Sequence, residues 1–185
     1  MDYILERIYH NSPPSHTRTR PLEVICVGPS RSGTESLRAA LLEIGYHNVY
    51  HGWEALKHTN EADFELHSQL LRKKYRSGDS SGKVRLTAED FDTLLARYDG
   101  LTDMDGAVFA ADLLEAYPNA KIIMNYRKDL NAWHKSFVET FGALGSSWMF
   151  WFMSHFEAQL YWSRRFIFRE MSKYSEGPVS RKTIR

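Results

Sequence analysis

The sequence predicts an α/β fold in which helices flank a parallel β-sheet and a helical C-terminal part follows. Two observations support this prediction. Short apolar, β-branched runs are typical of buried strands, and the stretches between them have apolar residues at helical spacing. Strands that alternate with helices favour parallel βαβ units with helices on both faces of the sheet. At 185 residues, the chain is long enough for one such domain and short for two.

The first strand and the helix after it have the clearest pattern. Leu22–Val27 is an apolar run that Gly28 and Pro29 end, as expected of a buried strand. Residues 1–20 before it are polar and contain two adjacent prolines, so we expect a flexible N-terminal arm ahead of a single domain over residues 21–185. After Glu35 the spacing becomes helical up to a stop at Gly45, with apolar residues at Leu37, Leu41 and Ile44.

The remaining elements follow from the same rules. A capping box formed by Thr87 and Asp90 predicts a helix through about Ala96, and Pro118 is expected to stop a later helix. A polar turn is expected at residues 77–82. The other predicted elements are strands over His47–Tyr50, Gly100–Asp103 and Lys121–Tyr126, the last of them buried, and helices over about 53–75, Ala107–Tyr117, Leu130–Phe141 and Ser147–Met171.

Composition limits the classes of function. Lys and Arg (24) nearly balance Asp and Glu (23), so the net charge of +1 gives no general attraction to nucleic acid or to anionic membranes. The N-terminus lacks an apolar signal segment, and Ser147–Trp162 is too short and too polar to span a bilayer, so a cytoplasmic location is expected. The one cysteine, Cys26, lies in an apolar run and is expected to be an inert buried thiol.

The turn at residues 28–36 carries the most chemical information. A buried strand enters it and a helix leaves it at once, so backbone N–H groups and the positive end of the helix dipole point at one place. Gly28 and Gly33 allow an anion to approach the backbone closely. This arrangement predicts a phosphate-binding loop. Its further donors are Arg31, Thr34 and Ser36.

The turn matches neither of the common nucleotide-binding patterns. It lacks the Lys-Ser/Thr pair of the Walker loop, which argues against hydrolysis of a nucleoside triphosphate with magnesium. Only two glycines of the dinucleotide fingerprint can be matched. A P-loop nucleotide phosphotransferase or hydrolase stays an alternative, as does a degenerate, non-catalytic P-loop interaction module.

The segment Pro29–Leu41 (PSRSGTESLRAAL) resembles the 5′-phosphosulfate loop of sulfotransferases that use 3′-phosphoadenosine-5′-phosphosulfate (PAPS). More closely, it is similar to the P-loop sulfotransferase-like family common in fungi. The likeness covers roughly residues 22–140, and its further landmarks occur in order along the chain: Tyr50-His51, Tyr98–Asp103, Ala116–Ile123 and Asn125–Ser136. The resemblance implies a P-loop-type sheet and transfer of a sulfuryl group from PAPS, as co-substrate, to a small-molecule hydroxyl or amine. Relatives of this kind extend further, so the resemblance also implies a domain truncated at its C-terminus.

The resemblance also implies which residues bind the nucleotide. An Arg and a Ser after the later strand hold the 3′-phosphate in such enzymes. Ser136 matches that serine, and Lys128 falls at the usual Arg position, with Arg127 one residue early. A lysine can hold a phosphate as a point charge, without bidentate geometry. The 5′-phosphosulfate is expected to contact Ser30, Arg31, Ser32, Gly33, Thr34, Glu35 and Ser36.

Three residues are candidates for the chemistry. Arg31 takes the place of a catalytic lysine or arginine in related loops, and because it is always protonated its role would be electrostatic. A base must also deprotonate the acceptor, and His51, at the end of the second predicted strand, is the first candidate. Asp103, at the end of the third, is its rival, while Asp105 could instead cap a helix.

The remaining histidines and aromatic residues are given other roles. His47 and His51 lack the helix and glutamate of a zinc motif, so no metal is expected, and His58 and His67 are expected on an exposed helix face. The aromatic C-terminal helices are expected to form core or interface, with a homodimer as one outcome. Their stripe comprises Trp148, Trp151, Phe152, Phe156, Trp162 and Phe166.

Overall fold

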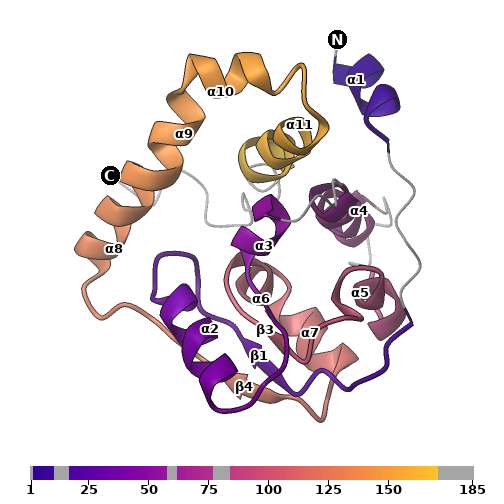
Figure 1. Cartoon of the computed structure of the whole chain (residues 1–185), viewed down its shortest axis with the longest axis vertical. Helices are drawn as coiled ribbons and strands as arrows, with labels where there is room; N and C mark the ends of the chain where they lie inside the picture. Colours follow the sequence, from indigo (N-terminus) through magenta and orange to yellow (C-terminus); the bar gives the residue numbers. More distant parts are fainter. Residues whose placement is uncertain (1, 11–16, 58–61, 77–83, 171–185) are drawn as a thin grey trace.

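The structure, a computed structural model, describes residues 2–10, 17–57, 62–76 and 84–170 (Figure 1). Its centre is a four-stranded sheet in the order β2-β3-β1-β4, and every pair of neighbouring strands is parallel. The fold is therefore α/β with a parallel sheet, as the sequence predicts. The strands are β1 (Val24–Cys26), β2 (Val49–Tyr50), β3 (Gly100–Leu101) and β4 (Lys121–Ile123).

Different helices cover the two faces of the sheet. Side chains of β1 alternate, so Val24 and Cys26 pack with Leu41 on one face, while Ile25 joins a larger cluster on the other. Leu41 belongs to α2, and the larger cluster takes side chains from α4 to α7 and from α11. The helices between the strands are α2 (Thr34–Glu43), α3 (Gly52–Lys57), α4 (Ala62–Arg76), α5 (Ala88–Leu95), α6 (Met104–Val108) and α7 (Ala110–Ala116).

The prediction of a buried strand over Lys121–Tyr126 is wrong in its burial and its length. β4 ends at Ile123 and lies at the edge of the sheet, where Ile122 is 43% exposed. Met124 and Tyr126, which follow the strand, are 69% and 71% exposed. An apolar run alone does not distinguish a central strand from an edge strand, because the order of strands is set by packing far along the chain.

The C-terminal part is helical, as predicted, but it is divided into more segments. From α8 to α10 the chain runs as an arc along one side of the molecule, and α11 and η2 turn back onto α4 (Figure 1). Ser147 and Glu157 each accept backbone hydrogen bonds at the start of a helix, which explains the breaks. The segments are α8 (Leu130–Phe137), the π-helix η1 (Val138–Gly142), α9 (Ala143–Ser146), α10 (Trp148–Met153), α11 (Ala158–Arg164) and the π-helix η2 (Arg165–Glu170).

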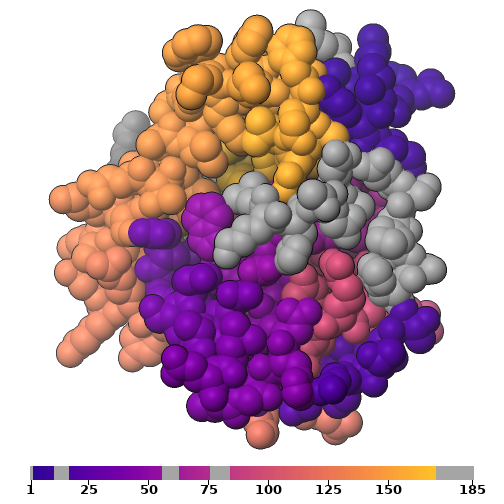
Figure 2. Space-filling model, in the orientation of Figure 1, coloured from indigo at the N-terminus to yellow at the C-terminus, as the bar shows by residue number. Residues whose placement is uncertain are grey.

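The aromatic stripe of this part splits into two groups. Trp162 and Phe166 are 1% exposed and belong to the core. The other four lie in α10 or just after it and are between 48% and 76% exposed: Trp148, Trp151, Phe152 and Phe156. Side chains of α10 stand on the surface at the top of the space-filling view (Figure 2). Within the part of the chain that the structure describes, no helix combines the length and the apolar character needed to cross a membrane.

The N-terminal segment is not a free arm where the structure describes it. Asp2–Ile8 forms the helix α1, which lies beside α11 (Figure 1). The indole N–H of Trp162 donates to the carbonyl oxygen of Tyr9 at 2.8 Å, and the Tyr9 hydroxyl donates to the carbonyl oxygen of His155 at 2.8 Å. Glu6 pairs with Arg72 at 2.6 Å and with Arg165 at 3.0 Å. These contacts tie the start of the chain to the C-terminal helices.

Candidate functional site

The turn at residues 28–36 leaves the carboxyl end of β1 and leads directly into α2. Gly33 has φ +87°, a conformation that costs glycine little. A Cβ on Gly28 would lie 2.2 Å from the carbonyl oxygen of Asn125, so only glycine fits there. The two glycines of the turn therefore allow its backbone to pack closely against the segment after β4.

The first turn of α2 is open to an anion. Gly33 occupies its N-cap position and provides no side-chain hydrogen bond. The backbone N–H of Leu37 bonds to the carbonyl oxygen of Gly33 at 3.0 Å, so the N–H groups before it in the first turn have no carbonyl partner within the helix. These N–H groups and the helix dipole make this end of α2 suitable for a phosphate or sulfuryl group.

Two residues from the C-terminal half of the chain hold the turn in place. The Asn125 amide donates to the Ser32 hydroxyl at 2.7 Å, and Ser32 donates to the carbonyl oxygen of Pro29. The Trp133 indole donates to the carbonyl oxygen of Ser30 at 2.9 Å. Asn125 follows β4 and Trp133 lies on α8, so the turn is fixed from the side on which the resemblance places the 3′-phosphate.

The basic residues predicted to bind the nucleotide differ in whether they line the cavity. Arg31 Nε donates to Ser136 Oγ at 3.0 Å, although the two residues are 105 positions apart. Arg127 lines the same cavity as Arg31, and both Arg127 and Lys128 are exposed at the surface. Keeping the family register placed Lys128 at the phosphate. Of these two residues, Arg127 borders the cavity and Lys128 does not.

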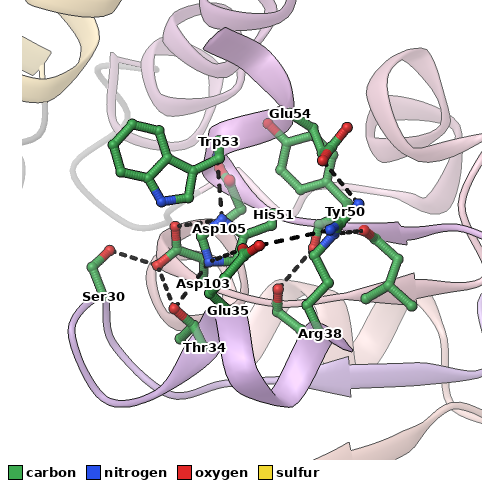
Figure 3. Close-up of polar contacts among 12 residues, drawn as sticks. Ser30, Thr34, Glu35, Arg38, Tyr50, His51, Trp53, Glu54, Asp103 and Asp105 are labelled. Atoms are coloured by element: carbon green, nitrogen blue, oxygen red, sulfur yellow. Dashed lines mark hydrogen bonds and ion pairs between the residues drawn. The ribbon is translucent and has the colours of Figure 1, made fainter. Parts of the chain in front are cut away.

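The two candidate bases lie together beside the turn (Figure 3). Asp103 Oδ1 accepts hydrogen bonds from the Ser30 hydroxyl at 2.7 Å and from the Thr34 hydroxyl at 3.3 Å. His51 Nε2 is 3.1 Å from Thr34 Oγ1, and its Nδ1 is 3.6 Å from Asp103 Oδ2. Ends of β2 and β3 thus meet the turn after β1, as expected at the carboxyl edge of a parallel sheet.

The hydrogen bonds define the proton positions on His51. The backbone N–H of Trp53 can only donate, and it donates to His51 Nδ1 at 3.2 Å. Nδ1 therefore carries a lone pair, and the proton of the neutral ring is on Nε2. The Thr34 hydroxyl accepts a hydrogen bond from Nε2 and donates one to Asp103, so each donor in this chain of hydrogen bonds has an acceptor.

Both residues with unusual backbone geometry belong to this site. Arg31 has φ +69° and Asp103 has φ +76° with ψ −155°, and they are the non-glycine residues with positive φ among those described. The Asp103 conformation is almost restricted to glycine and costs about 1–3 kcal/mol. Hydrogen bonds from Ser30 and Thr34 offset that cost by fixing the carboxylate.

These residues line one cavity of about 320 Å³. One part, the loop half, is formed by residues 30, 31 and 33–36 together with Arg127 and Ser136. The other part, the helical half, is formed by apolar side chains of α4 and the C-terminal helices: Phe64, Phe141, Leu144, Phe166 and Ile167. His51 and Asp103 also line the cavity, as do Tyr50, Trp53, His67 and Asp105.

His67 is not on an exposed helix face, contrary to the expectation from sequence. It is 1% exposed, and its Nε2 is 2.7 Å from Asp105 Oδ1. Its Nδ1 is 2.6 Å from the carbonyl oxygen of Asp63, which can only accept, so Nδ1 carries a proton. Burial lowers the pKa of His67, but the adjacent Asp105 carboxylate and the carbonyl of Asp63 outweigh burial and raise it overall. Asp105 is therefore the partner of a buried histidine rather than a helix cap.

The structure brings most of the predicted site residues to the cavity. Ser32 and Lys128 do not line it, since the Ser32 hydroxyl bonds within the turn and Lys128 is exposed. Cys26 is fully buried, and burial raises the pKa of its thiol to about 11, as expected of an inert residue. Those that line the cavity are Ser30, Arg31, Gly33, Thr34, Glu35, Ser36, His51, Asp103, Arg127 and Ser136.

Four residues of the site have functions that sequence reasoning missed. Asn125 and Trp133 hold the turn, and His67 and Asp105 form a charged pair in the cavity wall. Asn125 had a signal, because it lies two residues after the end of β4, at the ligand-binding edge of the sheet. The other three depend on contacts between elements far apart in sequence. No group of acidic, histidine and cysteine residues suited to a metal ion occurs in the described ranges, while His58 lies outside them.

The pattern of the sulfotransferase domain family matches residues 23–183. The chain belongs to this family. A curated relative, the Ava biosynthesis cluster protein M of Aspergillus versicolor, is 32% identical to it over 130 residues. The matched segment covers 70% of this chain but only 46% of that relative, so the chain spans about half the length of the relative it matches.

Proposed function

We propose that this protein transfers a sulfuryl group from PAPS to a hydroxyl or amine of a small molecule. The observation that carries the proposal is the 3.0 Å contact between Arg31 and Ser136 at one cavity. It brings the turn that the resemblance assigns to the 5′-phosphosulfate next to the helix that it assigns to the 3′-phosphate. Membership of the sulfotransferase domain family supports the same reaction.

The residues present fit the nucleotide. The uncapped start of α2 presents backbone donors, and Arg31 and Arg127 supply two fixed positive charges in the loop half of the cavity. PAPS supplies an activated sulfuryl group on an anionic leaving group. Two arginines and a helix N-terminus are the donors expected for an anion of this kind.

In this proposal Arg31 stabilises the negative charge that develops on the 5′-phosphate as its bond to sulfur breaks. The acceptor oxygen or nitrogen forms the new bond to sulfur and loses its proton to the protein. The products are a sulfated acceptor and 3′-phosphoadenosine-5′-phosphate, with no change in oxidation state. Arg31 remains protonated throughout, so its contribution is electrostatic.

We assign the base to Asp103 and a donor role to His51. The backbone N–H of Trp53 occupies the lone pair of His51 Nδ1, which leaves a proton on Nε2 that faces Thr34. His51 is thus set to donate toward the turn. Asp103 is a carboxylate at the same cavity, and its strained backbone supports a functional role.

Binding of 3′-phosphoadenosine-5′-phosphate, measured by titration calorimetry, tests the proposal. We expect the protein to bind it in preference to ATP with magnesium, because the turn lacks the Lys-Ser/Thr pair that ATP sites use. Arg31→Ala should weaken binding roughly 10- to 150-fold, the loss of a hydrogen bond to a charged group. Lys135→Ala is the matched control, since Lys135 is exposed on the same helix as Ser136.

The same titration identifies the cation at the 3′-phosphate. Arg127 lines the cavity and Lys128 does not, so Arg127→Ala should weaken binding at least tenfold more than Lys128→Ala. No binding of 3′-phosphoadenosine-5′-phosphate by the folded protein would reject the proposal. Tighter binding of ATP with magnesium would favour the phosphotransferase alternative.

A further inference from the structure

The helical half of the cavity determines what kind of acceptor fits. Its wall consists of aromatic and aliphatic side chains, and Phe64 and Phe166 are 5% and 1% exposed. Such a surface gains free energy by covering an apolar ring and gains nothing from a sugar or a phosphate. This half of the cavity therefore suits an acceptor with an apolar body.

One charged pair interrupts this apolar wall. His67 comes from α4 and Asp105 from α6, their side chains are 1% and 7% exposed, and both residues line the cavity. The Tyr50 hydroxyl is 3.3 Å from His67 Nε2. His67 Nδ1 carries a proton, and although burial lowers the pKa of His67, the adjacent Asp105 carboxylate helps to raise it overall.

Stability alone does not explain this pair. A buried ion pair is often no more stabilising than well-packed apolar side chains of the same volume, because both charges lose their hydration. Here apolar rings cover part of the pair, as His67 packs against Phe166 at a centroid distance of 5.0 Å and against Phe64 at 6.2 Å. A buried charge pair that lines a ligand cavity is a candidate for ligand recognition.

We propose that Asp105 binds a second hydrogen-bond-donating group of the acceptor, and that His67 positions the Asp105 carboxylate for this contact. The acceptor is then an apolar ring compound with two donors, one that receives the sulfuryl group beside Asp103 and one that Asp105 holds. Asp103 and Asp105 are two residues apart at the start of α6, so they can hold two groups of one small molecule. The inference rests on the proposed function for the identity of the reacting group.

Naphthols are suitable probes, because they are apolar ring compounds that differ only in hydroxyl groups. Binding of 2-naphthol, 2,6-dihydroxynaphthalene and 2,7-dihydroxynaphthalene is measured by fluorescence titration, with and without 3′-phosphoadenosine-5′-phosphate. The wild-type protein should bind one of the two diols about tenfold more tightly than 2-naphthol, the effect of one hydrogen bond to a charged group. The preferred isomer reports the spacing of the two donors.

Two variants separate recognition from structure. His67→Leu with Asp105→Leu removes both members of the pair together, which costs less than removing one member alone, and circular dichroism checks that the protein remains folded. This double variant should bind all three probes with equal affinity. Ile167→Ala is the matched control, because Ile167 is part of the apolar wall. It should weaken all three probes by a similar factor and keep the preference for a diol.

Equal binding of naphthol and diols by the wild type, or a diol preference that persists in the double variant, would overturn the role of Asp105. Failure of the folded protein to bind any of the probes would overturn the apolar ring class. The nucleotide titration is independent of these results. If the nucleotide fails to bind while the diol preference depends on Asp105, the proposed sulfuryl transfer falls and the ring-binding site stands.

Discussion

Arg31 and Asp103 are the two residues of the site with a strained backbone conformation. Both have positive φ, and both line the cavity. Such conformations persist only where contacts hold them. Arg31 donates a hydrogen bond to Ser136, and Asp103 accepts hydrogen bonds from Ser30 and Thr34. The strain is therefore maintained by contacts that also connect the turn after β1 to α8 and to the end of β3.

The assignment of the base predicts the effects of two substitutions. Asp103→Asn can still accept from Ser30 and Thr34 but cannot take a proton, so kcat should fall at least about 100-fold while nucleotide affinity changes little. His51→Gln can still donate toward Thr34 and should lose less, about tenfold. Steady-state kinetics with PAPS and the preferred naphthol measures both. A larger loss for His51→Gln would make His51 the base.

His67 makes stability depend on pH in a defined direction. Its pKa is raised in the folded protein above the value of about 6.5 expected for the unfolded chain. The folded state therefore binds a proton more tightly, and this contribution is complete below about pH 6.5 and is lost as pH rises through the folded pKa. The free energy of unfolding should then fall with a slope of at most about 1.4 kcal/mol per pH unit.

Urea denaturation between pH 6 and pH 9 measures this slope. The wild type and His134→Gln, a control at an exposed histidine of α8, should decline together. His67→Gln should show a shallower decline. The same slope in His67→Gln as in the wild type would mean that His67 does not hold its proton above neutral pH.

At the scale of elements, local signals predicted α5 best. Thr87 accepts from the backbone N–H of Asp90, and Asp90 accepts from the backbone N–H of Thr87 at 2.9 Å, as the sequence predicts for a capping box. β1 and α2 were also predicted nearly to their ends, because a turn with two glycines separates them. The helix expected over Ala107–Tyr117 is instead α6 and α7, broken at Phe109, whose buried ring belongs to the core.

The capping box makes a quantitative prediction. Thr87→Ala should lower the free energy of unfolding by about 1 kcal/mol, because it leaves backbone N–H groups at the start of α5 without their side-chain acceptor. Thr93→Ala, an exposed threonine within the same helix, should change it by less than about 0.5 kcal/mol. Urea denaturation gives both values, and equal effects of the two substitutions would show that the box contributes nothing to stability.

At the scale of the whole molecule, the cavity depends on contacts that no local pattern contains. The turn residues of the loop half could be predicted, because they are adjacent in sequence and connect a strand to a helix. The helical half and the His67–Asp105 pair could not, since the helical half needs the C-terminal helices to lie beside α4 and the pair joins α4 to α6. The burial of β4 was mispredicted for a similar reason, as its place at the edge depends on the order of all four strands.

The N-terminal segment shows the same dependence, because its role is visible only in contacts with the other end of the chain. Tyr9 packs on Tyr161 at a centroid distance of 5.6 Å and donates to the carbonyl oxygen of His155. Tyr9→Ala should lower the free energy of unfolding by about 2 kcal/mol through lost apolar burial and one lost hydrogen bond. Tyr3→Ala, at a residue 70% exposed on α1, should change it by less than about 0.5 kcal/mol.

The two tyrosine variants also separate a structural role of the N-terminus from a role in the site. α11 and η2 follow one another, and Phe166 and Ile167 of η2 line the cavity. Tyr9→Ala removes contacts between the N-terminal segment and these helices. It should therefore weaken binding of 2-naphthol, which we expect to contact Phe166 and Ile167, more than binding of 3′-phosphoadenosine-5′-phosphate at the turn after β1. Urea denaturation and the two titrations on Tyr9→Ala measure the three effects. If the free energy of unfolding is unchanged in Tyr9→Ala, residues 2–10 contribute nothing to stability and behave as the flexible arm that their polar sequence predicts.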